Sequence, residues 1–209
     1  MRRLLLVAIL LAGSLCAMAQ FHLGIRSGFS APYYTHYSEG KDLNGVKVES
    51  RYSSSAIVGI HVGAFGLYEV PIVDEFSLEG EGGVQFSRLG GSVAGVTTSL
   101  YYMQFPMRAN AVYHLGELGS AGPASILASI GPQIGIGLGG SMNQYTVEWG
   151  EGGMNRLNVD LSFHLGMRFS RIPLQGTVFY ELGLTSYGGS KHESNTLNNV
   201  GISVAYLFF

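Results

Sequence analysis

The sequence predicts an all-β protein, an eight-stranded antiparallel up-and-down transmembrane β-barrel. Three observations lead to this fold class. Apolar residues occupy every second position over most of the chain after residue 20, which is the period of a β-strand. Only 12% of the residues are charged and 31 of 209 are glycine, whereas an ordinary soluble domain carries roughly twice this charge. The apolar rows contain hardly any charge, as contact with hydrocarbon requires.

The chain begins with the parts of an export signal. These parts are a positive start, an apolar run and two small residues before a cleavage position, namely Arg2 and Arg3, 4–12, and Ala17 with Ala19. We expect residues 1–19 to be a signal peptide that is cleaved before Gln20, and residues 20–209 to form the barrel domain. The apolar run is about half of the roughly 20 residues that a membrane-spanning helix needs. The only cysteine, Cys16, would leave with the signal, so we expect no disulfide.

Four segments with alternating residues occupy the first half of the mature chain. In each, the apolar residues share one face of a strand, and glycine, polar and charged residues share the other. In chain order the apolar rows are Phe21, Leu23, Ile25 and Phe29; Ala56, Val58, Ile60, Val62 and Ala64; Phe76, Leu78, Val84 and Phe86; and Tyr101, Met103, Phe105, Met107 and Ala109.

The fifth segment is the hardest to assign, because residues 118–147 contain no charged side chain and a transmembrane helix has to be considered. Six helix-breaking residues between Gly131 and Gly140 argue against a helix. Residues from Ile126 to Leu138 alternate instead, which favours a strand. Pro132 cannot donate a ladder hydrogen bond, so we expect a bulge or bend there.

Three further segments complete the set of eight. The clearest runs from Leu157 to Ser170, where every odd position is apolar and the even positions include Asp160, His164 and Arg168. The other two rows are Val178, Tyr180, Leu182 and Leu184, and then Val200, Ile202, Val204, Tyr206 and Phe208. The connections alternate between longer and shorter ones and lie around 32–51, 69–74, 89–97, 114–122, 140–156, 171–173 and 187–195.

A membrane barrel explains the two faces of these strands. Strands of about 10–15 residues match the roughly 9–11 tilted residues that span a bilayer, and a sheet in lipid must close because an open edge leaves backbone groups unpaired. An eight-stranded barrel is just filled by its inward side chains. We therefore expect acids and bases to pair inside as a lumen network, formed by Arg26, Glu79, Glu81, Arg108, Asp160, Arg168 and Glu181.

Several short motifs resemble those of PorT-like outer-membrane β-barrel proteins. They are Tyr102-Met103-Gln104-Phe105-Pro106, Ile130-Gly131-Pro132-Gln133-Ile134-Gly135, Glu181-Leu182-Gly183-Leu184-Thr185, Phe76-Ser77-Leu78-Glu79-Gly80-Glu81 and the ending Val204-Ala205-Tyr206-Leu207-Phe208-Phe209. The resemblance extends over nearly the whole mature chain. It implies an eight-stranded barrel in the bacterial outer membrane and, for some members, a part in protein secretion. The ending also resembles the signal that barrel-assembly machinery reads, although two terminal Phe residues leave open which ring faces lipid.

The sequence contains little that suggests chemistry. The six histidines lack zinc-site spacing, so we expect no metal, no other cofactor and no catalytic residue. One exception is His192-Glu193-Ser194-Asn195, which resembles the His-x-Ser-Asn run of barrel enzymes that deacylate lipid A. That resemblance implies Ser194 as nucleophile, His192 as base and Glu181 as an orienting group, although Gly188-Gly189-Ser190-Lys191 place the run in a loop.

We therefore expect a small, non-enzymatic outer-membrane barrel with a structural or interaction role, linked to protein secretion or to cell-surface contacts. Its expected partners are outer-membrane lipid, the assembly machinery and a protein bound by the long loops, where Tyr33, Tyr34, Tyr37, Tyr145 and Trp149 are candidate contact groups. A net charge of −2 gives no reason to expect nucleic acid. The alternatives are the lipid-modifying enzyme and a soluble exported β-barrel or sandwich that binds an apolar ligand.

Overall fold

A computed structural model describes residues 20–41, 47–119, 122–150, 154–186 and 193–208. The predicted signal peptide, residues 1–19, lies outside the described residues. Within the described ranges the chain forms β1 (Gln20–Ser30), β2 (Tyr33–Lys41), β3 (Lys47–Ser53), β4 (Gly59–Val73), β5 (Phe76–Val93), β6 (Val96–Glu117), β7 (Pro123–Met142), β8 (Tyr145–Thr146), β9 (Leu157–Phe169), β10 (Leu174–Gly183) and β11 (Glu193–Phe208). No helix in these ranges is long and apolar enough to cross a membrane.

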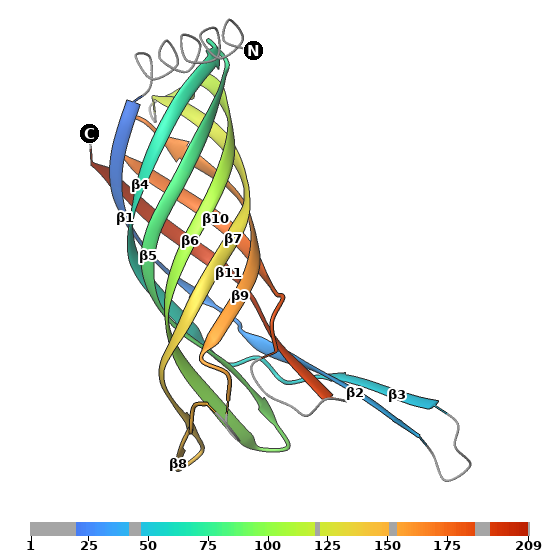
Figure 1. Cartoon of the computed structure of the whole chain (residues 1–209). Helices are drawn as coiled ribbons and strands as arrows, with labels where there is room; N and C mark the ends of the chain where they lie inside the picture. The colour runs from blue at the N-terminus through green and yellow to red at the C-terminus, as the bar shows by residue number, and fades with distance from the viewer. Residues whose placement is uncertain (1–19, 42–46, 120–121, 151–153, 187–192, 209) are drawn as a thin grey trace, which may run out of the picture.

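Eight of the strands form a closed ring (Figure 1). The ring order is β1-β4-β5-β6-β7-β9-β10-β11, with antiparallel neighbours throughout, and β11 pairs back onto β1 from Leu23↔Phe208 to Ser30↔Gly201. Closure gives a partner to the backbone groups that two open edges would expose to hydrocarbon. The predicted eight-stranded antiparallel up-and-down transmembrane β-barrel is confirmed.

The apolar rows face outwards and the polar rows face inwards. Leu165, Val178 and Ile202 are neighbours on β9, β10 and β11, and each keeps more than half of its surface exposed, at 56%, 54% and 58%. The inward positions between them are buried. At the C-terminus Phe208 faces outwards while Leu207 is buried inside the barrel, which decides which of these two side chains meets lipid.

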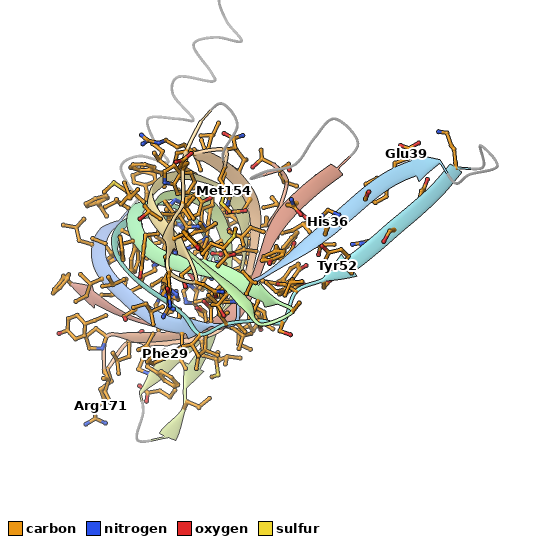
Figure 2. The ribbon with its side chains drawn as sticks, turned by 90° about the horizontal axis from the view of Figure 1, so that it is seen from below. Phe29, His36, Glu39, Tyr52, Met154 and Arg171 are labelled. Carbon is orange, nitrogen blue, oxygen red and sulfur yellow. The ribbon has the colours of Figure 1, made fainter. Side chains whose placement is uncertain are left out.

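The first long connection differs from the sequence-based expectation. Much of this segment is not a loop, because residues 33–41 and 47–53 form the paired strands β2 and β3, and β2 also pairs with the start of β11, from Glu193↔Ser38 to Asn198↔Tyr33. We call this three-stranded extension of β11, β2 and β3 the arm. Figures 1 and 2 both show the arm leading away from the barrel wall. Both faces of the arm lie outside the membrane, so its strands lack the alternation with apolar residues by which the barrel strands were recognised.

The third connection is also shorter than expected. In place of a loop over 89–97, β5 and β6 continue as a hairpin to a two-residue turn at Ala94 and Gly95. Both turn residues have positive φ, 49° and 82°, which suits a tight hairpin turn and explains the glycine. The last expected connection, 187–195, is also shorter at its C-terminal end, because β11 already begins at Glu193.

Pro132 does not shift the register as expected. The β6–β7 pairing has the same register on both sides of it, at Pro106↔Gln133 and at Ala109↔Ile130, and the shifts of this strand pair lie at Tyr101/Tyr102 and His114/Gly116. Between these two pairs the β6–β7 ladder is interrupted. Pro132 therefore lies at a gap in the pairing and not at a bulge.

Gly131, beside that gap, is expected to be intolerant of a side chain. A Cβ there would meet the backbone of β6, with the carbonyl oxygen of Met107 as its nearest contact and the Cα atom of Arg108 at 2.7 Å. We expect Gly131→Ala to lower the free energy of unfolding by about 1–3 kcal/mol, because neither backbone can move within a closed ring. Urea unfolding of the refolded barrel measures this loss. Gly80→Ala is the control, since no atom lies within 4 Å of its Cβ position; equal losses in both variants would contradict the steric argument.

Candidate functional site

The middle of the lumen is crossed by an ion network centred on Glu81. Its carboxylate oxygen Oε1 lies 2.7 Å from Arg26 Nη2 and 2.7 Å from Arg108 Nη1, so strands β1, β5 and β6 meet at one acid. Arg108 also donates to Ser162 Oγ at 3.2 Å and to Gln133 Oε1 at 3.3 Å. The guanidinium of Arg26 lies 4.0 Å from the centroid of the Phe65 ring, a cation–π contact within the lumen.

A second cluster pairs Arg168 with Glu79. The two side chains form an ion pair, and a second hydrogen bond joins Arg168 Nη2 to Glu79 Oε2 at 2.9 Å. Gln175 Oε1 accepts two further hydrogen bonds from the same guanidinium at 3.1 and 2.9 Å, and Asn110 donates to Glu79 at 3.0 Å. A bidentate arginine–carboxylate pair fixes both side chains, so β5 and β9 are joined through the lumen.

Two acids of the expected set have amides as partners in place of arginines. Glu181 accepts hydrogen bonds from Gln133 Nε2 at 3.1 Å and Asn199 Nδ2 at 2.8 Å, and both oxygens of Asp160 lie 2.7 Å from Asn158 Nδ2. Over the described part of the chain, neither acid forms an ion pair within 4.0 Å. The structure thus places all seven expected residues, which are Arg26, Glu79, Glu81, Arg108, Asp160, Arg168 and Glu181, in buried positions of the lumen. It groups five of them into two ion clusters.

Sequence reasoning missed the amides that connect these charges. Gln133, Asn158 and Asn199 occupy inward positions of β7, β9 and β11 and are buried. Their position opposite the apolar rows was the signal that could have identified them. A charge-based search omits them because amides carry no formal charge.

An apolar cap lies at the end of the barrel from which the arm extends. Leu89, Leu100, Tyr102, Val147 and Leu197 are buried together, and Tyr34, Trp149 and Met154 pack against them. The Trp149 ring meets the Tyr102 ring edge-on at 5.9 Å between centroids. Trp149 is therefore not a displayed contact group as expected, because its loop folds back over the lumen. Tyr145, in contrast, is 79% exposed.

The arm presents a polar face outside the barrel. Facing residues in register bring Thr35, Tyr37 and Glu39 of β2 beside Ser53, Arg51 and Glu49 of β3. A hollow of about 500 Å³ lies on this face, lined by Thr35, Tyr37, Glu49, Arg51, Ser194 and Thr196. It offers hydroxyl groups, an aromatic ring and charges of both signs within one surface.

Charged neighbours on the arm influence one another. Lys47 Nζ donates to Glu39 Oε1 at 2.8 Å, and this hydrogen bond and charge raise the pKa of the Lys47 amine. On the opposite face the His36 and Tyr52 rings lie 4.7 Å apart, and His36 Nδ1 is 2.7 Å from Asn195 Oδ1 (Figure 2). These contacts hold the two strands of the hairpin and the start of β11 together.

Of the three residues that the lipid-deacylase resemblance implies, the described part of the chain contains Ser194 and Glu181 and does not bring these two together. Ser194 lies on β11 and lines the hollow, and His192 lies outside the described residues. Glu181 cannot orient them, since it is buried in the lumen and bonded to Gln133 and Asn199. The part of the chain that the structure describes also contains no group of three His, Cys, Asp or Glu side chains arranged to hold a metal ion.

No protein-family model and no curated protein sequence matches the chain. Among solved structures, Ail, the attachment invasion locus protein of Yersinia pestis, is 14% identical with a TM-score of 0.38, covering 88% of this chain and 98% of that chain. Neisserial surface protein A is 11% identical with a TM-score of 0.39, covering 90% and 97%. The translocator domain of the autotransporter NalP from Neisseria meningitidis is 12% identical with a TM-score of 0.28, covering 95% of each chain.

The assignment to the outer membrane therefore depends on the structure itself. The ring is closed, its outer wall is an apolar band, and its inside is polar and filled. This is the architecture of bacterial outer-membrane barrels. The chain is an outer-membrane β-barrel, and its polar arm extends beyond the apolar band.

Proposed function

We propose that this protein is a filled, non-enzymatic outer-membrane barrel that acts as an interaction protein through its arm. The observation that carries the proposal is the polar hollow on the arm, where Tyr37 and Arg51 lie beside hydroxyl groups of Ser194 and Thr196. Tyrosine and arginine are the residue types that most often dominate binding at interfaces. The arm is also rigidly attached, because β2 pairs directly with the extension of a barrel strand.

The filled lumen supports the same proposal. Arg108 reaches from β6 to Ser162 on β9, and Arg168 reaches from β9 to Glu79 on β5. These side chains join strands that are not neighbours in the ring, and the apolar cap covers one end. A barrel of this kind serves as an anchor for the arm.

The partner proposed for the arm is a protein or another molecule at the cell surface. The resemblance to PorT-like proteins supports a component of protein secretion as that partner, while the exposed polar face equally fits a contact with another surface. Outer-membrane lipid is the proposed partner of the barrel wall. The barrel-assembly machinery is the proposed partner of the C-terminal end of β11, at Phe208.

Removing the arm tests the proposal. His36 and Tyr52 are a hydrogen-bonded pair of β2 and β3, so residues 37–51 can be replaced by an Asn-Gly turn that joins them directly. We expect the shortened chain to remain a heat-modifiable barrel and yet to fail to restore the lost trait in a strain deleted for the gene. The traits measured are attachment to protein-coated and polysaccharide-coated surfaces and protein secretion into the medium. If the armless barrel restores the trait as well as the full chain, the proposal is wrong.

A further inference from the structure

The outer edge of β3 has no strand beside it in the described part of the chain, where the sheet order ends at β3. The hydrogen bond from Ser54 N to Tyr34 O, 2.8 Å long, identifies which residues of β3 bond to β2. Bonded and non-bonded residues alternate along an antiparallel pair, so Ser50 and Tyr52 also bond inwards. The peptide groups of Lys47, Glu49 and Arg51 then point away from the arm and are free to pair with another strand.

This edge lacks several devices that block edge-to-edge pairing. Its sequence, KVESRYS, has no proline, and its register with β2 contains no bulge. Charged side chains are present, but in a pattern of opposite signs. Glu49 and Arg51 lie two residues apart, so both project from the same face, and both are exposed.

Neither charge is held in a close ion pair within the described arm, although Lys47 on the same strand attracts Glu49. Glu49 is opposite Glu39 in the register and accepts a hydrogen bond from Tyr37, and Arg51 is opposite Tyr37. Among the described residues neither takes part in an ion pair within 4.0 Å. The outer edge therefore presents an acid and a base that are both available to a neighbouring strand.

We propose that the β3 edge pairs antiparallel with the β3 edge of a second copy of this chain. If Ser50 faces Ser50 of the other copy, Glu49 faces Arg51 of that copy and Arg51 faces its Glu49. Both pairs are then hydrogen-bonded ladder positions with opposite charges. If Glu49 faced Glu49 of the other copy, or Arg51 faced its Arg51, like charges would lie opposite each other, which is unfavourable. The charge pattern thus selects one self-complementary register.

The placement of the arm allows such a dimer in one membrane. Antiparallel pairing of identical edges requires a two-fold axis perpendicular to the sheet. Figure 1 shows the arm nearly edge-on, and Figure 2, which looks along the barrel, shows its strands broadside. The axis therefore runs roughly along the barrel, and both copies keep the same orientation across the bilayer. The arms join in a six-stranded sheet over the membrane surface.

Cysteine cross-linking tests the register. In this pairing Ser50 and its counterpart form a non-hydrogen-bonded pair with Cα atoms about 4.5 Å apart, within the range for a disulfide. We expect Ser50→Cys in the full chain to form covalent dimers upon oxidation of intact outer membranes. Ser38→Cys is the matched control, since Ser38 lies opposite Ser50 on β2 and its copies would be roughly 14 Å apart across three strand spacings. Equal cross-linking of both variants, or none at position 50, would overturn the proposal.

Charge exchange tests the pairing itself and does not depend on the function of the hollow. Glu49→Arg places arginine opposite arginine, and we expect roughly tenfold weaker dimerisation in sedimentation equilibrium of the folded protein in detergent. The double variant E49R/R51E restores opposite charges and should dimerise within about threefold of the unmodified chain. Rescue also separates a lost contact from misfolding. A double variant as weak as the single one, or an unmodified chain that is monomeric throughout, would contradict the proposal.

Discussion

Replacing Arg108 by alanine is expected to destabilise the barrel by about 3–5 kcal/mol, since it removes one partner of a buried ion pair and leaves the other charged. Arg108 is buried and provides hydrogen bonds to Glu81, Gln133 and Ser162, on three other strands. Without it Glu81 keeps only Arg26 as a counter-charge. Urea unfolding in phospholipid vesicles measures the change, with the fluorescence of Trp149, the single tryptophan, as the signal.

A matched arginine on the arm supplies the control for this prediction. Arg51 is exposed, and in the described chain it has no ion-pair partner, so Arg51→Ala should change the free energy of unfolding by no more than about 0.5 kcal/mol. A loss for Arg108→Ala that is as small as that of Arg51→Ala would mean that the lumen network contributes little to stability.

Replacing Val178 by arginine is expected to cost about 2–4 kcal/mol, because it places a charge in the apolar wall near the middle of a barrel strand. Val178 is 54% exposed and flanked by Leu165 and Ile202. Its exposure is to hydrocarbon, where a guanidinium loses its hydration. The measurement is again urea unfolding of the barrel refolded in phospholipid vesicles.

Ile172 allows the effect of depth to be separated from the effect of exposure. It is equally exposed, at 55%, but lies in the turn between β9 and β10. A charge near the interface costs only about 0–1 kcal/mol, so Ile172→Arg should be well tolerated. If Val178→Arg were no worse than Ile172→Arg, the apolar rows would not lie in the bilayer.

The strands of the ring could be recognised from the sequence because the solvent differs on their two sides. Leu157 to Phe169 alternates between lipid-facing and lumen-facing positions, and this difference in environment produces the alternation of residue types. The seven charged lumen positions could be found for the same reason. Their pairing could not, because one alternating strand does not show which side chain it faces across the barrel.

The sequence-based predictions were wrong where the two sides of a strand have the same environment. The arm strands Tyr33–Lys41 and Lys47–Ser53 have water on both sides, so their residues show no apolar row and were expected to form a loop. The hairpin extension around Ala94 was missed in the same way. Trp149 was expected on the surface because it lies in a long connection, although the chain folds it onto Tyr102.

By itself, the sequence determined that the chain is a closed membrane barrel, how many strands form the ring and which face of each strand meets lipid. These properties follow from local alternation and from the need to satisfy every backbone group in hydrocarbon. Only the tertiary structure decided that Glu81 joins Arg26 to Arg108, that a cap covers the lumen and that β2 and β3 extend β11 as an arm. These features depend on contacts between residues far apart in the chain, and no local pattern records which distant residues meet.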